Sequence, residues 1–157
     1  MDPEAIVRFI AETCPGVDIM APTEGVAAGD TFFNYDPDHD LEPQHQMPFA
    51  TIVTHDYGEF DNASRLDREG VYRLNVGVGR QTFLDLFGAP SSAGGGDTDH
   101  EFYALDQLMP HPVYAPQWWV GVLNPSDATF ERVRPLIAAA YQLAVSRHDR
   151  RRTASGS

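Results

Sequence analysis

Apolar positions recur at helical spacing in three parts of the chain. The first part begins with Asp2 and a proline, a pair suited to capping and starting a helix, and it continues to Pro15. A short segment over residues 79–87 turns aromatic and leucine side chains to one side. The third part follows an Asn-Pro-Ser sequence and extends to about residue 147. This pattern predicts an N-terminal helix, a short helix and a long final helix.

Other segments have the alternating or β-branched character of strands. Residues 71–78 place Arg73, Asn75 and Gly77 on one side and apolar residues on the other. This alternation predicts an antiparallel strand that is buried on one face and polar on the other. Further strands are predicted at the start of 17–29 and at 30–35, 48–54 and 118–123, with a helical turn over 102–108.

The order of these elements predicts an α+β fold. One antiparallel sheet with the helices packed on one of its faces buries the apolar residues most simply. The length of 157 residues and the hydrophobic content of 42% suit a single domain, which we assign to residues 1–147. We expect residues 148–157 to form a disordered basic tail. The second face of the sheet should then be open and should display Arg73 and Asn75.

The charge of the chain narrows the classes of partner. The formal net charge is −12, and the 11 lysine and arginine residues are all arginines. Without lysine, the chain can neither form the usual pyridoxal-phosphate linkage nor use the lysine of a phosphate-binding loop. A body this acidic repels a nucleic-acid backbone, so nucleic acid is not the expected partner. DNA binding through an arginine patch is kept only as a weaker alternative.

Several features that suggest cofactors do not meet the requirements of their sites. The acidic segment 36–47 begins like a calcium loop but lacks its glycine and its closing glutamate. The glycine run within 89–100 follows no strand and opens no helix, as a phosphate loop would. Cys14, the single cysteine, allows no internal disulfide and no cysteine cluster for zinc. We therefore expect neither metal nor cofactor, and no membrane span or signal peptide, which predicts a cytoplasmic protein.

The segment 109–126 contains both tryptophans and the first candidate for chemistry, His111. Two prolines fix the backbone of His111 next to Tyr114, and a histidine held in this way could act as a general base. The alternative, which we favour, is that His111 packs and forms hydrogen bonds that fix the turn. Trp118 and Trp119 should point to opposite faces of their strand, and the one outside the core is a candidate to bind a ligand or partner. The sequence leaves open which of them faces the core.

A long polar connection, residues 55–70, contains further candidates. His55, Asp56 and Asp67 could form an acid/base pocket or a divalent-ion site together with arginines such as Arg65. Alternatively, Asp–Arg pairs and Asx turns could simply hold this loop together, which is the interpretation we favour.

Arg73 also has a ligand-binding interpretation and a structural one. On the open face of a strand, its guanidinium could bind a ligand carboxylate through two hydrogen bonds. It could equally pair with an acidic residue on a neighbouring strand. If Trp119 lies on the same open face, that face would also suit a two-fold homodimer.

Two long runs of the chain resemble known families. The runs RLNVGVGRQTFLDLFG and LDQLMPHPVYAPQWWVGVLNPSDATFERVRPLIAAAYQLA resemble the MmcQ/YjbR-like domains. With its PFATIV and MPHPVY runs, the chain is more similar still to a largely actinobacterial family of unknown function. The resemblance implies a two-layer α+β sandwich of the YjbR and frataxin type. It implies no defined activity, although DNA binding has been suggested for YjbR-like domains.

These observations predict a cytoplasmic, non-catalytic domain that binds a small molecule or a protein partner. The residues predicted to bind this ligand are Arg73, Trp119, Tyr114, His55 and Arg65. The alternative is a small enzyme that uses His111 with Asp56 or Asp67 as acid and base groups.

Overall fold

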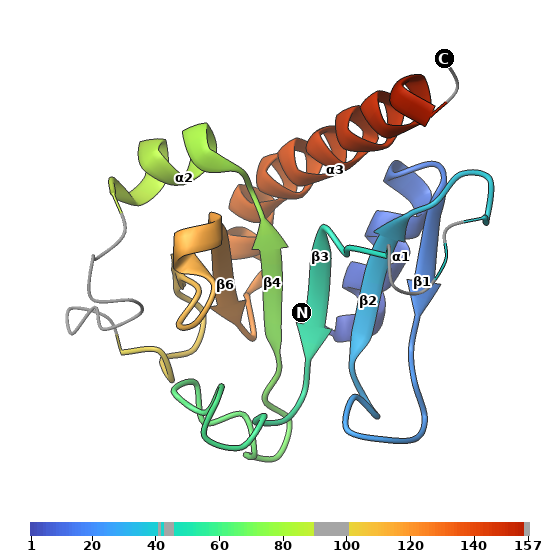
Figure 1. The fold of residues 1–157 in the computed structure, drawn as a ribbon. Coiled ribbons are helices and arrows are strands. Elements are labelled where there is room, and N and C mark those ends of the chain that lie inside the picture. The colour runs from blue at the N-terminus through green and yellow to red at the C-terminus, as the bar shows by residue number, and fades with distance from the viewer. Residues whose placement is uncertain (41, 43–45, 90–100, 156–157) are drawn as a thin grey trace.

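The computed structural model describes residues 1–40, 42, 46–89 and 101–155, and six strands in this part of the chain form one antiparallel sheet (Figure 1). The elements follow each other as α1 (Pro3–Thr13), β1 (Val17–Met20), β2 (Thr31–Tyr35), β3 (Ala50–Val53), β4 (Arg73–Gly77), α2 (Arg80–Phe87), β5 (Leu108–Pro110), the 3-10 helix η2 (Ala115–Gln117), β6 (Trp119–Leu123) and α3 (Asp127–Ser155). The strand order in the sheet is β1-β2-β3-β4-β6-β5.

The helices cover one face of the sheet and enclose the main core with it (Figure 1). Fully buried apolar side chains come from all three helices and from the four central strands: Ile6, Ile10, Phe33, Ile52, Leu74, Val76, Phe83, Val122, Phe130 and Ile137. Removal of these side chains from water is the main force that holds the helices on the sheet. The predicted α+β fold, a single antiparallel sheet with its helices on one face, is confirmed.

The edge strand β5 was not anticipated by the sequence pattern. Residues 101–107 contain a turn at 102–103 and an isolated bridge from Leu105 to Leu123 but no helix, so the predicted helical turn at 102–108 is wrong. Leu108 instead begins β5, which pairs with β6 at the edge of the sheet. A strand of three residues that ends in Pro110 shows no recognisable alternation, and proline is tolerated at a sheet edge because the missing N–H is not needed there.

The last helix is longer than the sequence predicts. α3 continues to Ser155, so residues 148–155 are helical where a disordered tail was predicted. His148 is only 6% exposed, and its ring makes an edge-to-face contact with Tyr35 of β2. Contact with the sheet therefore continues beyond residue 147, the predicted end of the domain.

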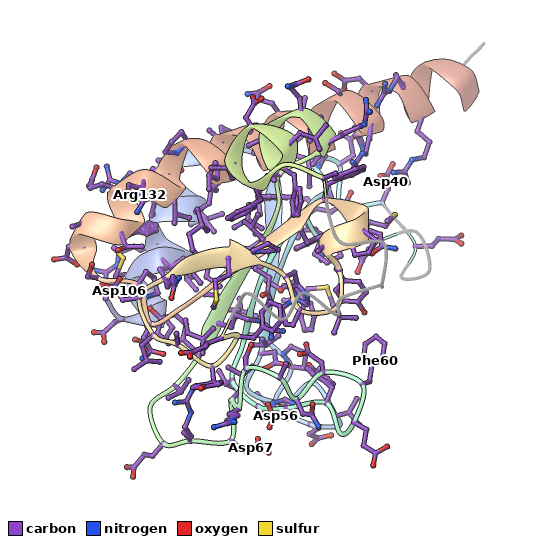
Figure 2. All side chains as sticks on the ribbon, turned by 90° about the vertical axis from the view of Figure 1, so that its left-hand side faces the viewer. Asp40, Asp56, Phe60, Asp67, Asp106 and Arg132 are labelled. Atoms are coloured by element: carbon purple, nitrogen blue, oxygen red, sulfur yellow. The ribbon has the colours of Figure 1, made fainter. Side chains whose placement is uncertain are left out.

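The second face of the sheet is covered by the connection between β3 and β4, residues 54–72. Leu66 of this loop is 1% exposed and packs into a second, smaller core formed with Val53, Met109 and Leu123. Arg73 and Asn75 are 1% and 3% exposed, so they are buried rather than displayed on an open face as predicted. Figure 2 shows Phe60 projecting from this loop, on the side of the molecule away from α1.

Candidate functional site

A cavity of about 790 Å³ lies on the loop-covered face of the sheet. Strand residues form its floor, and loop 54–72 and the segment that carries η2 contribute to its walls. Its apolar and aromatic lining includes Phe32, Met47, Val53, Phe60, Tyr114 and Trp119. Its polar lining includes Thr51, Asp61, Arg73, Asn75 and His111. An apolar cavity of this size with a few converging polar groups has the form of a small-molecule site.

Arg73 is the centre of the polar lining. Its Nε donates to Asn75 Oδ1 at 2.7 Å, and its Nη1 donates to Asp61 Oδ1 at 3.1 Å and to Ser64 Oγ at 2.9 Å. Its Nη2 donates to Asp61 Oδ2 at 2.5 Å and lies 3.3 Å from His111 Nε2. Of the two predicted roles, the structure forms an ion pair, but with an aspartate of the loop rather than of a neighbouring strand. The pairing offsets the cost of burying the guanidinium charge and ties the loop to β4.

The ring of His111 is oriented by the backbone that follows it. Its Nδ1 accepts hydrogen bonds from the backbone N–H groups of Val113 at 3.0 Å and Tyr114 at 2.9 Å. Because Nδ1 must therefore hold a lone pair, the hydrogen of the neutral ring is on Nε2. Burial, followed by the nearby charge of Arg73, lowers the pKa of His111 well below its ordinary value of 6.5. His111 is thus a neutral hydrogen-bond donor, and no lone pair is left for general-base catalysis.

The two tryptophans lie on opposite sides of the sheet. Trp119 begins β6 and lies close against Gly77 of β4, where a Cβ would come within 2.9 Å of the indole ring. Trp118 precedes the strand with a left-handed backbone (φ 71°) and packs edge-to-face on Phe83 in the main core. Trp119 is therefore the tryptophan that lines the cavity, and Trp118 is the one that faces the core.

Exposed apolar side chains contribute to the lining of the cavity. Met47, Phe60 and Tyr114 all line it, although they are 73%, 64% and 41% exposed. The rings of Phe60 and Tyr114 make an edge-to-face contact with centroids 6.0 Å apart, which joins the long loop to the segment before η2. Apolar groups gathered around a cavity are typical of a surface that a ligand or partner covers.

Three of the predicted site residues hold the long loop in its conformation. Asp56 Oδ1 accepts the backbone N–H of Leu66 at 2.8 Å, and Asp67 Oδ1 accepts the backbone N–H of Asp56 at 3.0 Å. The guanidinium of Arg65 lies 4.0 Å from the centroid of the Tyr103 ring. As formed by the described residues, the cavity is not lined by any of the three.

His55 joins the long loop to an earlier turn rather than to the cavity. Its Nε2 lies 2.6 Å from the carbonyl oxygen of Val26, and its Nδ1 lies 3.4 Å from Asp30 Oδ1. Asp30 is 1% exposed and also accepts a hydrogen bond from the hydroxyl of Tyr57. Burial, with the hydrogen bond to Asp30, raises the pKa of Tyr57, so this cavity-lining phenol stays neutral.

The structure does not assemble the predicted acid/base set. That enzyme would require His111 beside Asp56 or Asp67. In the described part of the chain, His111 is hydrogen-bonded to two backbone amides and faces Arg73, while both aspartates bond within the loop.

Three polar residues of the site were missed by sequence reasoning. Asp61, Ser64 and Thr51 were not among the predicted site residues. Thr51 Oγ1 accepts a hydrogen bond from Asn75 Nδ2 at 3.0 Å and extends the polar lining to β3. The signal for Asp61 is Arg73 itself, because an arginine buried on a central strand requires a carboxylate, and the loop that precedes this strand is rich in carboxylates.

Two segments, 36–47 and 55–70, carry the acidic and histidine residues that a metal site would need. No group of three metal-ligating side chains occurs among the residues searched, which are the described ones. His39 of the acidic segment lies 2.7 Å from Asp18 of β1 instead. His45 of the same segment, and the glycine run at 94–96, lie outside the described residues.

Comparison with known proteins identifies a family but no activity. Residues 1–153 match the DUF6194 family model, described as a family of unknown function. No curated protein and no solved structure matches the chain. Among the helices of the described part, none combines the length and the apolar character needed to cross a membrane.

Proposed function

We propose that this chain, which belongs to the DUF6194 family, is a non-catalytic protein that binds a small, largely apolar molecule in the cavity beneath loop 54–72. The observation that carries the proposal is the combination within one cavity of exposed aromatic side chains with a buried, hydrogen-bonded polar floor. The aromatic groups would supply affinity, and the fixed polar groups would supply orientation.

The dimensions of the cavity support a small molecule as the ligand. Known small-molecule sites have volumes of about 300–1,000 Å³, and the cavity volume of about 790 Å³ falls within that range. Trp119, Phe60 and Tyr114 offer rings that an apolar or aromatic ligand could contact. A ligand that covers Phe60 and Tyr114 would remove apolar surface from water, which favours binding.

The polar floor supports binding rather than catalysis. Asp61 and Asn75 hold the guanidinium of Arg73, and the backbone holds the imidazole of His111. Because these groups are fixed before a ligand arrives, little conformational entropy is lost on binding. The same contacts occupy the lone pair that His111 would need as a base.

Two further proposals concern the setting of the protein. We propose that it is cytoplasmic, because its single cysteine cannot form an internal disulfide. We also propose a relationship to the MmcQ/YjbR-like domains, supported by the runs RLNVGVGRQTFLDLFG and LDQLMPHPVYAPQWWVGVLNPSDATFERVRPLIAAAYQLA.

Binding of an apolar aromatic probe would test the proposed function. A dimethylaminonaphthalene with a propyl substituent is of suitable size, and the anisotropy of its fluorescence rises when it binds to the protein. We expect saturable binding at one site, with a rise in the melting temperature of the protein through mass action.

A pair of alanine variants supplies the control. Ala27 lines the cavity, whereas its neighbour Ala28 does not, and both are half-buried in the same turn. Overpacking costs about 1–3 kcal/mol, so Ala27→Trp should weaken probe binding by about fivefold or more while Ala28→Trp leaves it unchanged. Equal affinities for the two variants, or no saturable binding to the parent chain, would contradict the proposal.

A further inference from the structure

The two ring nitrogens of His111 are both approached by N–H groups. At Nδ1 these are the backbone amides of Val113 and Tyr114, at 3.0 Å and 2.9 Å. At Nε2 the neighbour is Arg73 Nη2, at 3.3 Å. A neutral imidazole has one lone pair and one N–H, so it can satisfy only one of these two sides.

The geometry decides which side is satisfied. Two backbone amides share the Nδ1 lone pair, so the ring hydrogen is on Nε2 and points toward Arg73, whose guanidinium can only donate. Arg73 cannot turn away, because Asp61, Ser64 and Asn75 hold its other N–H groups. In the described part of the chain, the group that faces His111 Nε2 is therefore another donor.

We infer that the molecule bound in this cavity places an acceptor oxygen against His111 Nε2–H and Arg73 Nη2–H. This inference rests on the proposed function, because it assigns a chemical group to the ligand of the same cavity. Both residues line the cavity and both are nine-tenths buried or more, at 2% and 1% exposure. With the two nitrogens 3.3 Å apart, one oxygen about 2.9 Å from each would accept a hydrogen bond from both.

The charge around these donors favours a neutral oxygen over a carboxylate. Asp61 already balances the charge of Arg73 through two hydrogen bonds. An anionic group placed against these donors would lie beside the carboxylate of Asp61, in a chain whose net charge is −12, and the other arginine of the lining, Arg147, comes from α3 rather than from this cluster. The expected ligand is therefore an apolar or aromatic molecule that carries a ketone or amide carbonyl.

Three matched probes separate these possibilities. The first is the propyl-substituted dimethylaminonaphthalene, the second is the corresponding propanoyl ketone, and the third is the corresponding carboxylate. Because a hydrogen bond contributes about 0.5–1.5 kcal/mol net, the ketone should bind the parent chain about 3- to 10-fold more tightly than the propyl compound. The carboxylate should bind more weakly than the ketone.

Two substitutions of His111 test the roles of its two ring nitrogens separately. In His111→Asn, the amide oxygen takes the place of Nδ1 and still accepts from Val113 and Tyr114, but the Nε2–H donor is lost. In His111→Gln, the amide nitrogen reaches the place of Nε2, but the acceptor at Nδ1 is lost. The preference is the ratio of ketone affinity to propyl affinity within one protein, so a general effect of a substitution on the cavity cancels. We expect this preference to fall to about twofold or less in His111→Asn. His111→Gln should keep a larger ketone preference at a lower melting temperature.

The binding data distinguish failure of the inference from failure of the proposed function. The inference would be overturned if the parent chain showed no ketone preference, or if His111→Asn showed the same preference as the parent chain. In either case, binding of the propyl compound would still support the proposed function. Tighter binding of the carboxylate than of the ketone would also overturn it. If neither uncharged probe binds the parent chain, both the inference and the proposed function fail.

Discussion

The two faces of β4 are buried to the same degree but by different chemistry. On the helix side, Leu74 and Val76 are 0% and 1% exposed and belong to the main apolar core. On the loop side, Arg73 and Asn75 are 1% and 3% exposed and belong to a hydrogen-bonded cluster. Burial alone therefore does not distinguish the core of this protein from its candidate site. The kind of group that is buried does.

The two kinds of burial make different contributions. Burying apolar surface stabilises the fold by about 25 cal/mol per Å², so the helix side supplies most of the stability. On the loop side, the cost of desolvating Arg73 and Asp61 offsets much of their mutual attraction. What the loop side supplies is a fixed geometry, in which a guanidinium and an imidazole present donors to a cavity. This contrast supports a role in binding for the loop side.

Removal of Asp61 should have the largest effect on stability. Asp61→Ala leaves the guanidinium of Arg73 buried without its carboxylate, which we expect to destabilise the protein by about 3–5 kcal/mol in urea unfolding. The double variant Arg73→Met with Asp61→Leu removes both charges and should recover most of this loss. If Asp61→Ala were nearly as stable as the parent chain, the ion pair would not be desolvated.

Truncation of a side chain on the helix side should have the second-largest effect on stability and should leave binding of the probe intact. Leu74 is fully buried, so Leu74→Ala should cost about 2–5 kcal/mol, whereas Leu74→Met should cost less than about 1.5 kcal/mol. The affinity of the propyl probe at the loop side should stay within about twofold, because Leu74 faces away from the cavity. A large loss of affinity would show that the two faces are coupled.

Lowering the pH should reduce the stability of the folded state, because His111 is kept neutral there. Because the pKa of His111 is lowered in the folded state, the unfolded chain binds a proton below about pH 6.5 that the folded chain excludes. The stabilisation is present above that pH and is lost as the pH falls toward the folded-state pKa. Between about pH 7.5 and pH 5.5, the parent chain should therefore lose more stability than His111→Asn. Parallel pH profiles of the two proteins would contradict this prediction.

The smallest effect on stability is expected at Phe60. Phe60 is 64% exposed, so Phe60→Ala should change stability by less than about 0.5 kcal/mol. Its loss from the cavity lining, together with its contact with Tyr114, should weaken binding of the propyl probe by about two- to fivefold. Leu86→Ala, at an exposed residue of α2 outside the cavity lining, is the matched control and should bind as the parent does.

The sequence predicted the fold better than the site, for a physical reason. Alternation along residues 71–78 correctly assigned the two faces of β4, because side chains of a strand alternate strictly. The same pattern could not show that loop 54–72 folds back over Arg73, because this depends on tertiary contacts of Leu66 and Asp61. The short strand β5 and the last turns of α3 were missed, since neither carries a long periodic signal.

The candidate residues fall into two groups, those that line the cavity and those that hold the loop. Arg73, Trp119, Tyr114 and His111 line the cavity, and Arg73 and Trp119 lie on strands that the pattern predicted. The predicted loop residues His55, Asp56, Asp67 and Arg65 instead form contacts that hold the loop. Composition alone could not separate these groups, because a polar loop can use its side chains for its own conformation or for a ligand.

The protonation state of His111 tests the central claim, that the loop side presents fixed hydrogen-bond donors, most directly. It can be read from the imidazole ¹⁵N resonances of the unliganded protein, with His111→Asn used to assign them. The structure predicts a hydrogen on Nε2, none on Nδ1, and no protonation as the pH is lowered through 6.5. A hydrogen on Nδ1, or protonation of His111 near pH 6.5, would contradict it.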